Sequence, residues 1–246
     1  MIKGEFAGDK KFGHSILHAP EQALIRWAIE RMPPRLQGYH LTLMSILWSA
    51  LAALFGYLAR TDLTWFWGVS AMIVCQYFTD SFDGSLGRAR GAGTIKWGFY
   101  MDHFLDYVFL CSLVLAGYFI APPGTGVHFF VLMMLLGGFM VSSFLLFAAT
   151  NRFKIAFHGI GPTELRIVLV VLNAVIIRTG TWHFGVTVPL LNAACLVGLG
   201  IVVKGASDEV WALDMAKKAE EAASAADPRA PKSAPGPHAA PASPAS

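Results

Sequence analysis

Six long apolar stretches constrain what this chain can fold into more than any other feature. They cover residues 41–59, 63–82, 97–120, 127–150, 165–177 and 182–203. Most have the roughly 20 residues that a helix needs to cross the hydrocarbon region of a bilayer. The fifth is shorter, and Arg166 and Arg178 near its ends can extend their side chains toward either interface. The sequence therefore predicts an all-α, polytopic membrane protein with six transmembrane helices.

The composition agrees with a chain that lies in lipid. Of the 246 residues, 55% are hydrophobic and 14% are charged, and the mean hydropathy is +0.52. Such a chain is too apolar for an ordinary soluble domain of this length. The net charge is only +3 and the basic residues form no aromatic-interleaved patch, which excludes a nucleic-acid-binding class. The three cysteines are too widely separated for a CxxC metal pair or a disulfide framework.

The distribution of basic residues predicts how the chain is oriented. When the six stretches alternate across the bilayer, all of the 19 lysines and arginines except Arg60 and Arg178 fall on one side. An excess of positive residues marks the cytoplasmic side of a membrane protein. We therefore expect both termini in the cytoplasm. The first forty residues have no apolar segment of signal-peptide type, and we expect the protein in a bacterial inner membrane.

The chain divides into three regions. These are an N-terminal cytoplasmic segment over 1–40, a six-helix transmembrane domain over 41–204 and a cytoplasmic tail over 205–246. In the first region, Pro20–Met32 has the spacing of an amphipathic helix, which can lie on the membrane surface or pack on the protein's own cytoplasmic face. The tail is rich in Ala and Pro and has no large apolar residue from Asp227 onward, so it is predicted to be disordered.

Four aspartates do not fit a simple bundle of apolar helices. Asp80 and Asp83 close the second stretch, and Asp102 and Asp106 lie near the start of the third. Each carboxylate costs about 2.5–3.5 kcal/mol near the bilayer centre, and somewhat less toward the interface. Spacings of three and four place each pair on one helix face, so that the two faces can meet. Such a cluster is either a structural ion-pair network or a site for hard divalent cations such as Mg²⁺ or Mn²⁺, and two ions are plausible.

Glycines and one arginine accompany the acids and indicate what the cluster binds. Gly84 directly follows Asp83, Gly87 comes three residues later, and Gly98 precedes Asp102 by four. A helical glycine lets a neighbouring backbone or a bulky ligand approach closely. The guanidinium of Arg88 can present a planar fork of donors to a phosphate. Together these residue types indicate a phosphoryl site, whereas Arg90 and Lys96 have the positions of ordinary topogenic charges.

The spacing of these residues resembles the signature of the CDP-alcohol phosphotransferase family. That signature is D-x-x-D-G-x-x-A-R, eight or nine residues, then G-x-x-x-D-x-x-x-D. The chain has seven of its eight fixed positions, in the run Asp80-x-x-Asp83-Gly84-x-x-Gly87-Arg88, nine residues, Gly98-x-x-x-Asp102-x-x-x-Asp106. The departure is Gly87, where the family has Ala, and it removes a methyl group but no reactive group. The six stretches and the amphipathic segment also resemble the family, up to about Lys204.

The resemblance implies a reaction and a role for each residue. A hydroxyl acceptor would attack the β-phosphorus of a CDP-alcohol and CMP would leave, in phospholipid synthesis. Asp106 matches the family's general base, and Thr42 resembles a threonine near the nucleotide, although it could equally be a helix cap. The implied metal ligands are Asp80, Asp83, Asp102 and Asp106, and the implied nucleotide-binding residues are Gly84, Gly87, Arg88 and Thr42.

The substrates stay open at this stage. Arg152, Lys154 and Arg166 could grip a phosphate-bearing acceptor, or they could be topogenic charges. Short likenesses at Met101-Asp102-His103 and 161–164 favour the branch that joins CDP-choline or CDP-ethanolamine to diacylglycerol. The alternative is a CDP-diacylglycerol donor with a soluble alcohol. The family also commonly forms homodimers, which makes a second copy an expected partner.

An acid-lined ion or proton-coupled transporter is the rival hypothesis. Intramembrane acids often mark ion pathways, and such proteins carry acids near the midplane in both halves of the chain. The last three apolar stretches contain no aspartate, while Glu164 lies just before the fifth. The sequence therefore favours the transferase, and flux into liposomes without any CDP-alcohol would favour the transporter.

Overall fold

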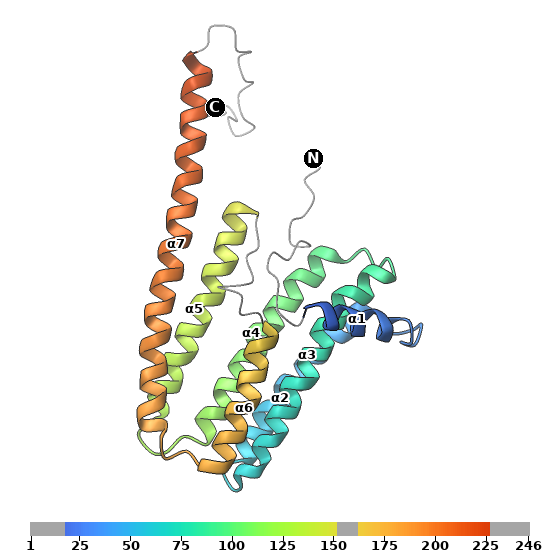
Figure 1. Ribbon diagram of the computed structural model, residues 1–246, viewed down its shortest axis with the longest axis vertical. Coiled ribbons are helices and arrows are strands. Elements are labelled where there is room, and N and C mark those ends of the chain that lie inside the picture. Colours follow the sequence, from blue (N-terminus) through green and yellow to red (C-terminus); the bar gives the residue numbers. More distant parts are fainter. Residues whose placement is uncertain (1–17, 152–161, 227–246) are drawn as a thin grey trace, which may run out of the picture. The chain divides into compact units, whose positions relative to one another are not determined.

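A computed structural model describes residues 18–151 and 162–226, and every regular element in these ranges is a helix (Figure 1). The all-α class is thus confirmed. The helices are α1 (His18–Ile29), α2 (Gly38–Leu58), the single 3₁₀ turn η2 (Leu63–Trp65), α3 (Phe66–Ala89), α4 (Ile95–Phe119), α5 (Gly126–Thr150), α6 (Pro162–Thr179) and α7 (Phe184–Ala226).

Four of these helices are long and apolar enough to cross a membrane. They are α2, Lys96–Phe119 of α4, α5 and Phe184–Ser224 of α7. The prediction of six spans is not confirmed, because α3 and α6 fall short among the described residues. The 18 residues of α6 include Glu164, Arg166 and Arg178, and the apolar run of α3 is interrupted by Gln76 and two aspartates. Charged and polar side chains therefore lower the hydropathy of the two helices that fall short.

The packing core forms where α2 lies against α3 and α4 (Figure 1). Gly56 of α2 lies so close to α4 that a Cβ there would be 2.4 Å from both Cα and Cβ of Ala116. Small residues at such a contact let two helix backbones approach. Buried apolar side chains surround it, among them Ala52, Val69, Ile73, Phe109 and Val114. At the start of η2, which precedes α3, the Thr64 backbone N–H donates to Asp62 over 2.9 Å and holds the pKa of that carboxyl below its ordinary value.

Helix α6 packs along α3 and is fixed there by polar contacts. The Nδ2 of Asn173 donates to the Oγ of Ser70 over 3.0 Å, and both side chains are buried. Arg166 precedes Asn173 by seven residues on α6, and it donates to Asp80, which follows Ser70 by ten residues on α3. The two helices therefore run antiparallel. Ile176 of α6 also joins the apolar core.

Helix α1 is tied to the end of α3 by Arg90. The Arg90 Nη2 donates to the carbonyl oxygens of Pro33 over 2.9 Å and Met32 over 3.2 Å, and Nη1 donates to two more carbonyls in the same turn. Arg90 thus holds the connection that follows α1, a role that its interpretation as a topogenic charge missed. Ile25 is buried against the protein, whereas Trp27 is 57% exposed. Packing on the protein's own surface therefore accounts for one face of α1.

The last helix extends beyond the predicted transmembrane domain. The chain forms two compact units, Met1–Lys204 and Gly205–Ser246. Helix α7 continues to Ala226, so the prediction of disorder is wrong for 205–226. This stretch is rich in Ala, Lys and Glu, which are strong helix formers even without a core, and its side chains from Trp211 to Ser224 are exposed. The remainder of the predicted disordered tail lies outside the described residues.

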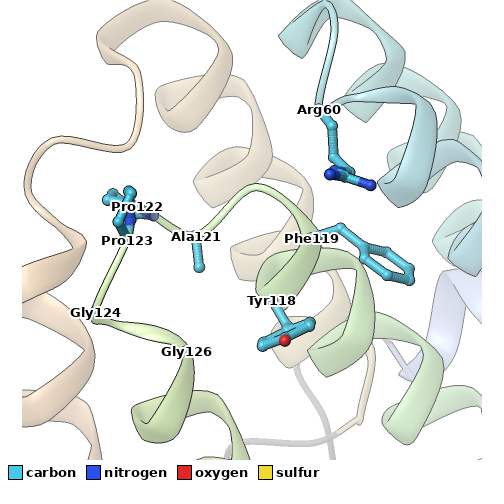
Figure 2. Close-up of a pocket in the computed structure, with 8 residues that line it drawn as sticks. All are labelled: Arg60, Tyr118, Phe119, Ala121, Pro122, Pro123, Gly124 and Gly126. Carbon is cyan, nitrogen blue, oxygen red and sulfur yellow. The ribbon is translucent and has the colours of Figure 1, made fainter.

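A cavity of about 370 Å³ opens at the C-terminal ends of α2 and α4. Figure 2 shows Arg60 extending from the end of α2 toward the connection that follows Phe119. No aspartate lines this cavity, which lies at the other end of α4 from Asp102 and Asp106. The cavity is therefore separate from the acid cluster.

Candidate active site

Helices α3 and α4 bring three of the four aspartates together. Asp80 lies on the C-terminal half of α3, and Asp102 and Asp106 lie on successive turns of α4. One carboxylate oxygen from each lies within 4.8 Å of the other two, and all three residues are half-buried. The predicted meeting of two acidic helix faces thus occurs for these three residues.

The spacing of the three carboxylates suits a hard divalent cation. Oxygen ligands lie about 2.0–2.6 Å from Mg²⁺ or Ca²⁺, so two ligands of one ion are separated by at most about 5 Å. The separations within the triple of Asp80, Asp102 and Asp106 meet this limit. Carboxylates are also the ligands that such ions prefer. The residues present therefore fit a divalent metal.

Asp83 occupies a separate and more buried position. Its Oδ2 accepts a hydrogen bond of 2.6 Å from the Oγ1 of Thr42, and its Oδ1 accepts one from the backbone N–H of Gly84. Thr42 is itself buried, inside α2 and one turn after its first residue. The helix-cap interpretation of Thr42 is wrong, because Gln37 is the N-cap of α2. Thr42 instead orients the Asp83 carboxylate from a neighbouring helix.

The glycines of the motif face open space, and a further glycine makes a close contact. A Cβ added at Gly87 or Gly98 would meet nothing within 4 Å, and one at Gly84 would meet only the guanidinium of Arg88, at 3.5 Å. Gly38 of α2 behaves differently, since its Cβ would lie 2.5 Å from the carbonyl oxygen of Asp83. Sequence reasoning missed Gly38, which lets α2 approach the motif directly.

Arg88 lies along its own helix beside the open glycine. Its Nη2 donates to the Oγ of Ser85 over 3.3 Å, and the side chain is exposed. The guanidinium therefore borders the space over Gly84. A phosphate in that space would be within reach of a planar, permanently charged donor.

Gln76 and Arg166 also belong to the site. The sequence did not indicate Gln76, and it predicted Arg166 as a possible ligand of a phosphate-bearing acceptor or as a topogenic charge, whereas the structure pairs Arg166 with Asp80. The Nε2 of Gln76 donates to the Oδ1 of Asp106 over 2.8 Å. The Nη2 of Arg166 donates to the Oδ2 of Asp80 over 2.7 Å and to the Oε1 of Gln76 over 2.9 Å. The position of Gln76, one helical turn before Asp80 on the same face, was a signal that could have identified it.

The remaining candidates are placed in part. His103 packs between Phe99 and Phe144, with ring centroids at 4.3 and 5.6 Å, and its Nδ1 lies 2.8 Å from the Phe99 carbonyl oxygen. This agrees with a packing residue. Arg152 and Lys154, predicted as possible acceptor ligands, lie outside the described residues.

The arrangement combines groups that suit phosphoryl chemistry. Three half-buried carboxylates stand at cation-binding distances, a fourth is oriented by Thr42, and an exposed arginine borders open space over a glycine. Carboxylates bind metal ions, metal ions neutralise phosphate oxygens, and arginine binds phosphate in a planar fork.

A comparison with models of known protein families finds a match that covers the segment with the aspartates. The family model described as CDP-alcohol phosphatidyltransferase matches residues 39–201, which is more than half of the chain and includes all four aspartates. A search of curated proteins gives no match.

Proposed function

Because the chain belongs to the CDP-alcohol phosphatidyltransferase family, we propose that it transfers a substituted phosphate group from a CDP-alcohol to a hydroxyl acceptor and releases CMP. The family implies phosphatidyl transfer in phospholipid synthesis. One observation carries the proposal: the carboxylates of Asp80, Asp102 and Asp106 converge within 4.8 Å at the motif spacing. This convergence is what a metal-assisted phosphoryl transfer requires.

Each acid has a proposed role. Two divalent cations, Mg²⁺ or Mn²⁺, would be held by the four aspartates Asp80, Asp83, Asp102 and Asp106. The ions would neutralise charge on the diphosphate. Asp106 takes the proton of the acceptor hydroxyl as general base. The acceptor oxygen then forms a bond to the β-phosphorus, and the bond from that phosphorus to the CMP oxygen breaks. The 2.8 Å hydrogen bond from Gln76 fixes the direction of the Asp106 carboxylate for this step.

The nucleotide has a proposed place beside the acids. Gly84 and Gly87 would let the CDP-alcohol approach the α3 backbone, since both have open space where a Cβ would be. Arg88, which borders Gly84, would donate to a phosphate. Thr42 contributes through Asp83, to which it donates over 2.6 Å.

The cellular setting follows from the charge distribution and the family. Four apolar helices suggest a membrane protein, and the basic residues favour termini in the cytoplasm. The proposed location is a bacterial cell membrane, with the site at its inner surface. A homodimer is the proposed assembly. The donor is either CDP-diacylglycerol, with a soluble alcohol as acceptor, or CDP-choline or CDP-ethanolamine, with diacylglycerol as acceptor.

The proposal is tested by CMP release from purified protein. Each donor is paired with its acceptor class and assayed with Mn²⁺, with Mg²⁺ and with excess chelator. We expect release from one donor class that requires both the metal and the acceptor. Folded protein that releases no CMP from any pair, or that releases it equally in chelator, would contradict the proposed function.

A variant at Asp83 tests the coordination. Asp83→Ala removes a carboxylate while the triple of Asp80, Asp102 and Asp106 stays in place. We expect the metal concentration for half-maximal CMP release to rise by roughly 10-fold or more, because a ligand or its orienting partner is lost. Asp62→Ala, in the connection between α2 and α3, is the matched control and should leave this value unchanged. An unchanged metal response in Asp83→Ala would refute its role as ligand.

A further inference from the structure

Gln76 is the most deeply buried of the polar side chains that α3 buries. It is 1% exposed, and the buried positions just before it, Met72 and Ile73, are apolar. A buried amide left without partners costs about 1–3 kcal/mol. Both ends of this amide are bonded to site residues: the nitrogen donates to Asp106 and the oxygen accepts from Arg166. An apolar residue of similar size would fill the position without this requirement, so the packing alone does not explain a glutamine.

Arg166 completes a chain of hydrogen bonds across three helices. A single nitrogen, Nη2, donates both to the Oε1 of Gln76 and to the Oδ2 of Asp80. The guanidinium carbon lies 5.6 Å from the centroid of the Tyr77 ring, which supports the cation from a second side. Asp106 of α4, Gln76 and Asp80 of α3, and Arg166 of α6 are thereby linked in one connected series.

The two residues act on the acid triple in different ways. Gln76 is neutral, so it orients the Asp106 carboxylate without changing the charge of the cluster. Arg166 adds a positive charge at 2.7 Å from Asp80 and offsets the mutual repulsion of the carboxylates, which would otherwise drive the side chains apart. Partners that orient metal ligands in this way typically change metal affinity by about 10–100-fold.

We propose that Gln76 and Arg166 are positioning residues that set the divalent-cation affinity of the triple formed by Asp80, Asp102 and Asp106. The hydrogen-bonded series holds Asp80 and Asp106 at cation-binding separation before an ion enters. This inference rests on the proposed function in assuming that the triple binds a metal. Neither residue belongs to the motif that identifies the family.

Direct Mn²⁺ binding tests the inference without any substrate. The full-length protein is titrated with Mn²⁺, and free ion is followed by electron paramagnetic resonance. Gln76→Leu keeps the volume but removes both hydrogen bonds, and we expect its Mn²⁺ affinity to fall by roughly 10–100-fold. Arg166→Lys retains the charge, so its affinity should lie closer to the wild-type value than that of Arg166→Met.

Asn173→Leu is the matched control. It removes a different polar contact between α6 and α3, the 3.0 Å bond to Ser70, whose two residues are not among the acids. If Gln76 merely holds α6 in place, both variants should weaken Mn²⁺ binding equally, and that result would overturn the inference. We expect Asn173→Leu to bind Mn²⁺ as the wild type does. Should Gln76→Leu not fold, Gln76→Met, which is unbranched and adapts to irregular space, takes its place.

The inference and the proposed function fail in different ways. Wild-type protein that binds Mn²⁺ more tightly than the Gln76 variants but releases no CMP from any donor would refute the function and support the positioning role. Wild-type protein that releases CMP, with Gln76→Leu and Gln76→Met binding Mn²⁺ at wild-type affinity, would refute the positioning role and leave the function standing.

Discussion

The two ends of the α2–α3–α4 core hold their helices together by different chemistry. At the end away from the acids, Gly56 of α2 touches Ala116 of α4, and apolar side chains such as Ile73 surround the contact. At the acid end, Gly38 lies against the carbonyl oxygen of Asp83, and side-chain hydrogen bonds to carboxylates join the helices. Both ends use glycine for close approach, but only one of them places carboxylates beside it.

This difference separates the fold from the chemistry. The apolar end accounts for the packing, because its side chains are buried against one another in one core cluster. The acid end is held by hydrogen bonds from Thr42, Gln76 and Arg166 to carboxylates. A change at one end should therefore affect the other only weakly. Variants at each end can test that separation.

The largest effect is expected from Asp106→Asn at the acid end. The substitution keeps an oxygen that can accept the hydrogen bond of Gln76, but it removes the proposed base. We expect CMP release to fall by about 10³-fold, since a positioned general base contributes on the order of 10²–10⁴ to rate. Thermal unfolding in detergent should match that of the wild type. Full CMP release by Asp106→Asn would refute the assignment, and unfolding of the variant would refute the separation.

At the apolar end, Gly56→Val should lower the stability of the fold, which Asp106→Asn is expected to leave unchanged. A Cβ at this position would lie 2.4 Å from backbone and Cβ atoms of Ala116, so α2 and α4 must move apart. We expect a loss of about 2–3 kcal/mol of stability, as in other overpacked cores, measured by thermal unfolding and by the fraction of monodisperse protein. Gly200→Val, on α7 where a Cβ meets nothing within 4 Å, is the control and should unfold as the wild type does. An equal loss in both variants would show that the contact with Ala116 is not the cause.

Local patterns predicted the helices and the acidic faces, because both depend on residues close in sequence. Spacings of three and four were enough to place Asp102 and Asp106 on one face, and the structure brings them to Asp80 as expected. Contacts of the site that join residues far apart in sequence were not predicted. Arg166 meets Gln76 and Asp80 across 90 and 86 positions, and its sequence neighbourhood indicated only a phosphate ligand or a topogenic charge.

Two other differences have local causes. Residues 205–226 extend α7 because Ala, Lys and Glu favour a helix even where no core is available; the absence of apolar side chains predicted only the absence of a core. In α3 and α6, Asp80 and Arg166 lower the hydropathy of the helices that carry them, and the spans predicted at 63–82 and 165–177 stay unconfirmed.

A smaller effect at the acid end is expected from Thr42→Val. Valine keeps the shape of the side chain and removes the 2.6 Å hydrogen bond to Asp83, whose other oxygen still accepts from Gly84. We expect the Mn²⁺ concentration for half-maximal CMP release to rise about tenfold, the equivalent of one hydrogen bond to a charged group, about 1.5 kcal/mol. Thr42→Ser retains the hydroxyl and should behave as the wild type. If the serine and valine variants respond alike, the hydroxyl does not orient Asp83.

The smallest effect is expected from Gly87→Ala, which is compared with the same substitution at Gly38. Gly87→Ala restores the alanine of the family signature, and its Cβ would meet nothing within 4 Å. We expect stabilisation by about 0.5–1 kcal/mol, because alanine loses less backbone entropy in a helix. Gly38→Ala is the matched contrast, since its Cβ would lie 2.5 Å from the carbonyl oxygen of Asp83. That variant should lose CMP release as α2 is displaced from the motif. Equal behaviour of the two alanine variants in thermal unfolding and CMP release would mean that the close approach of α2 does not hold Asp83 in place.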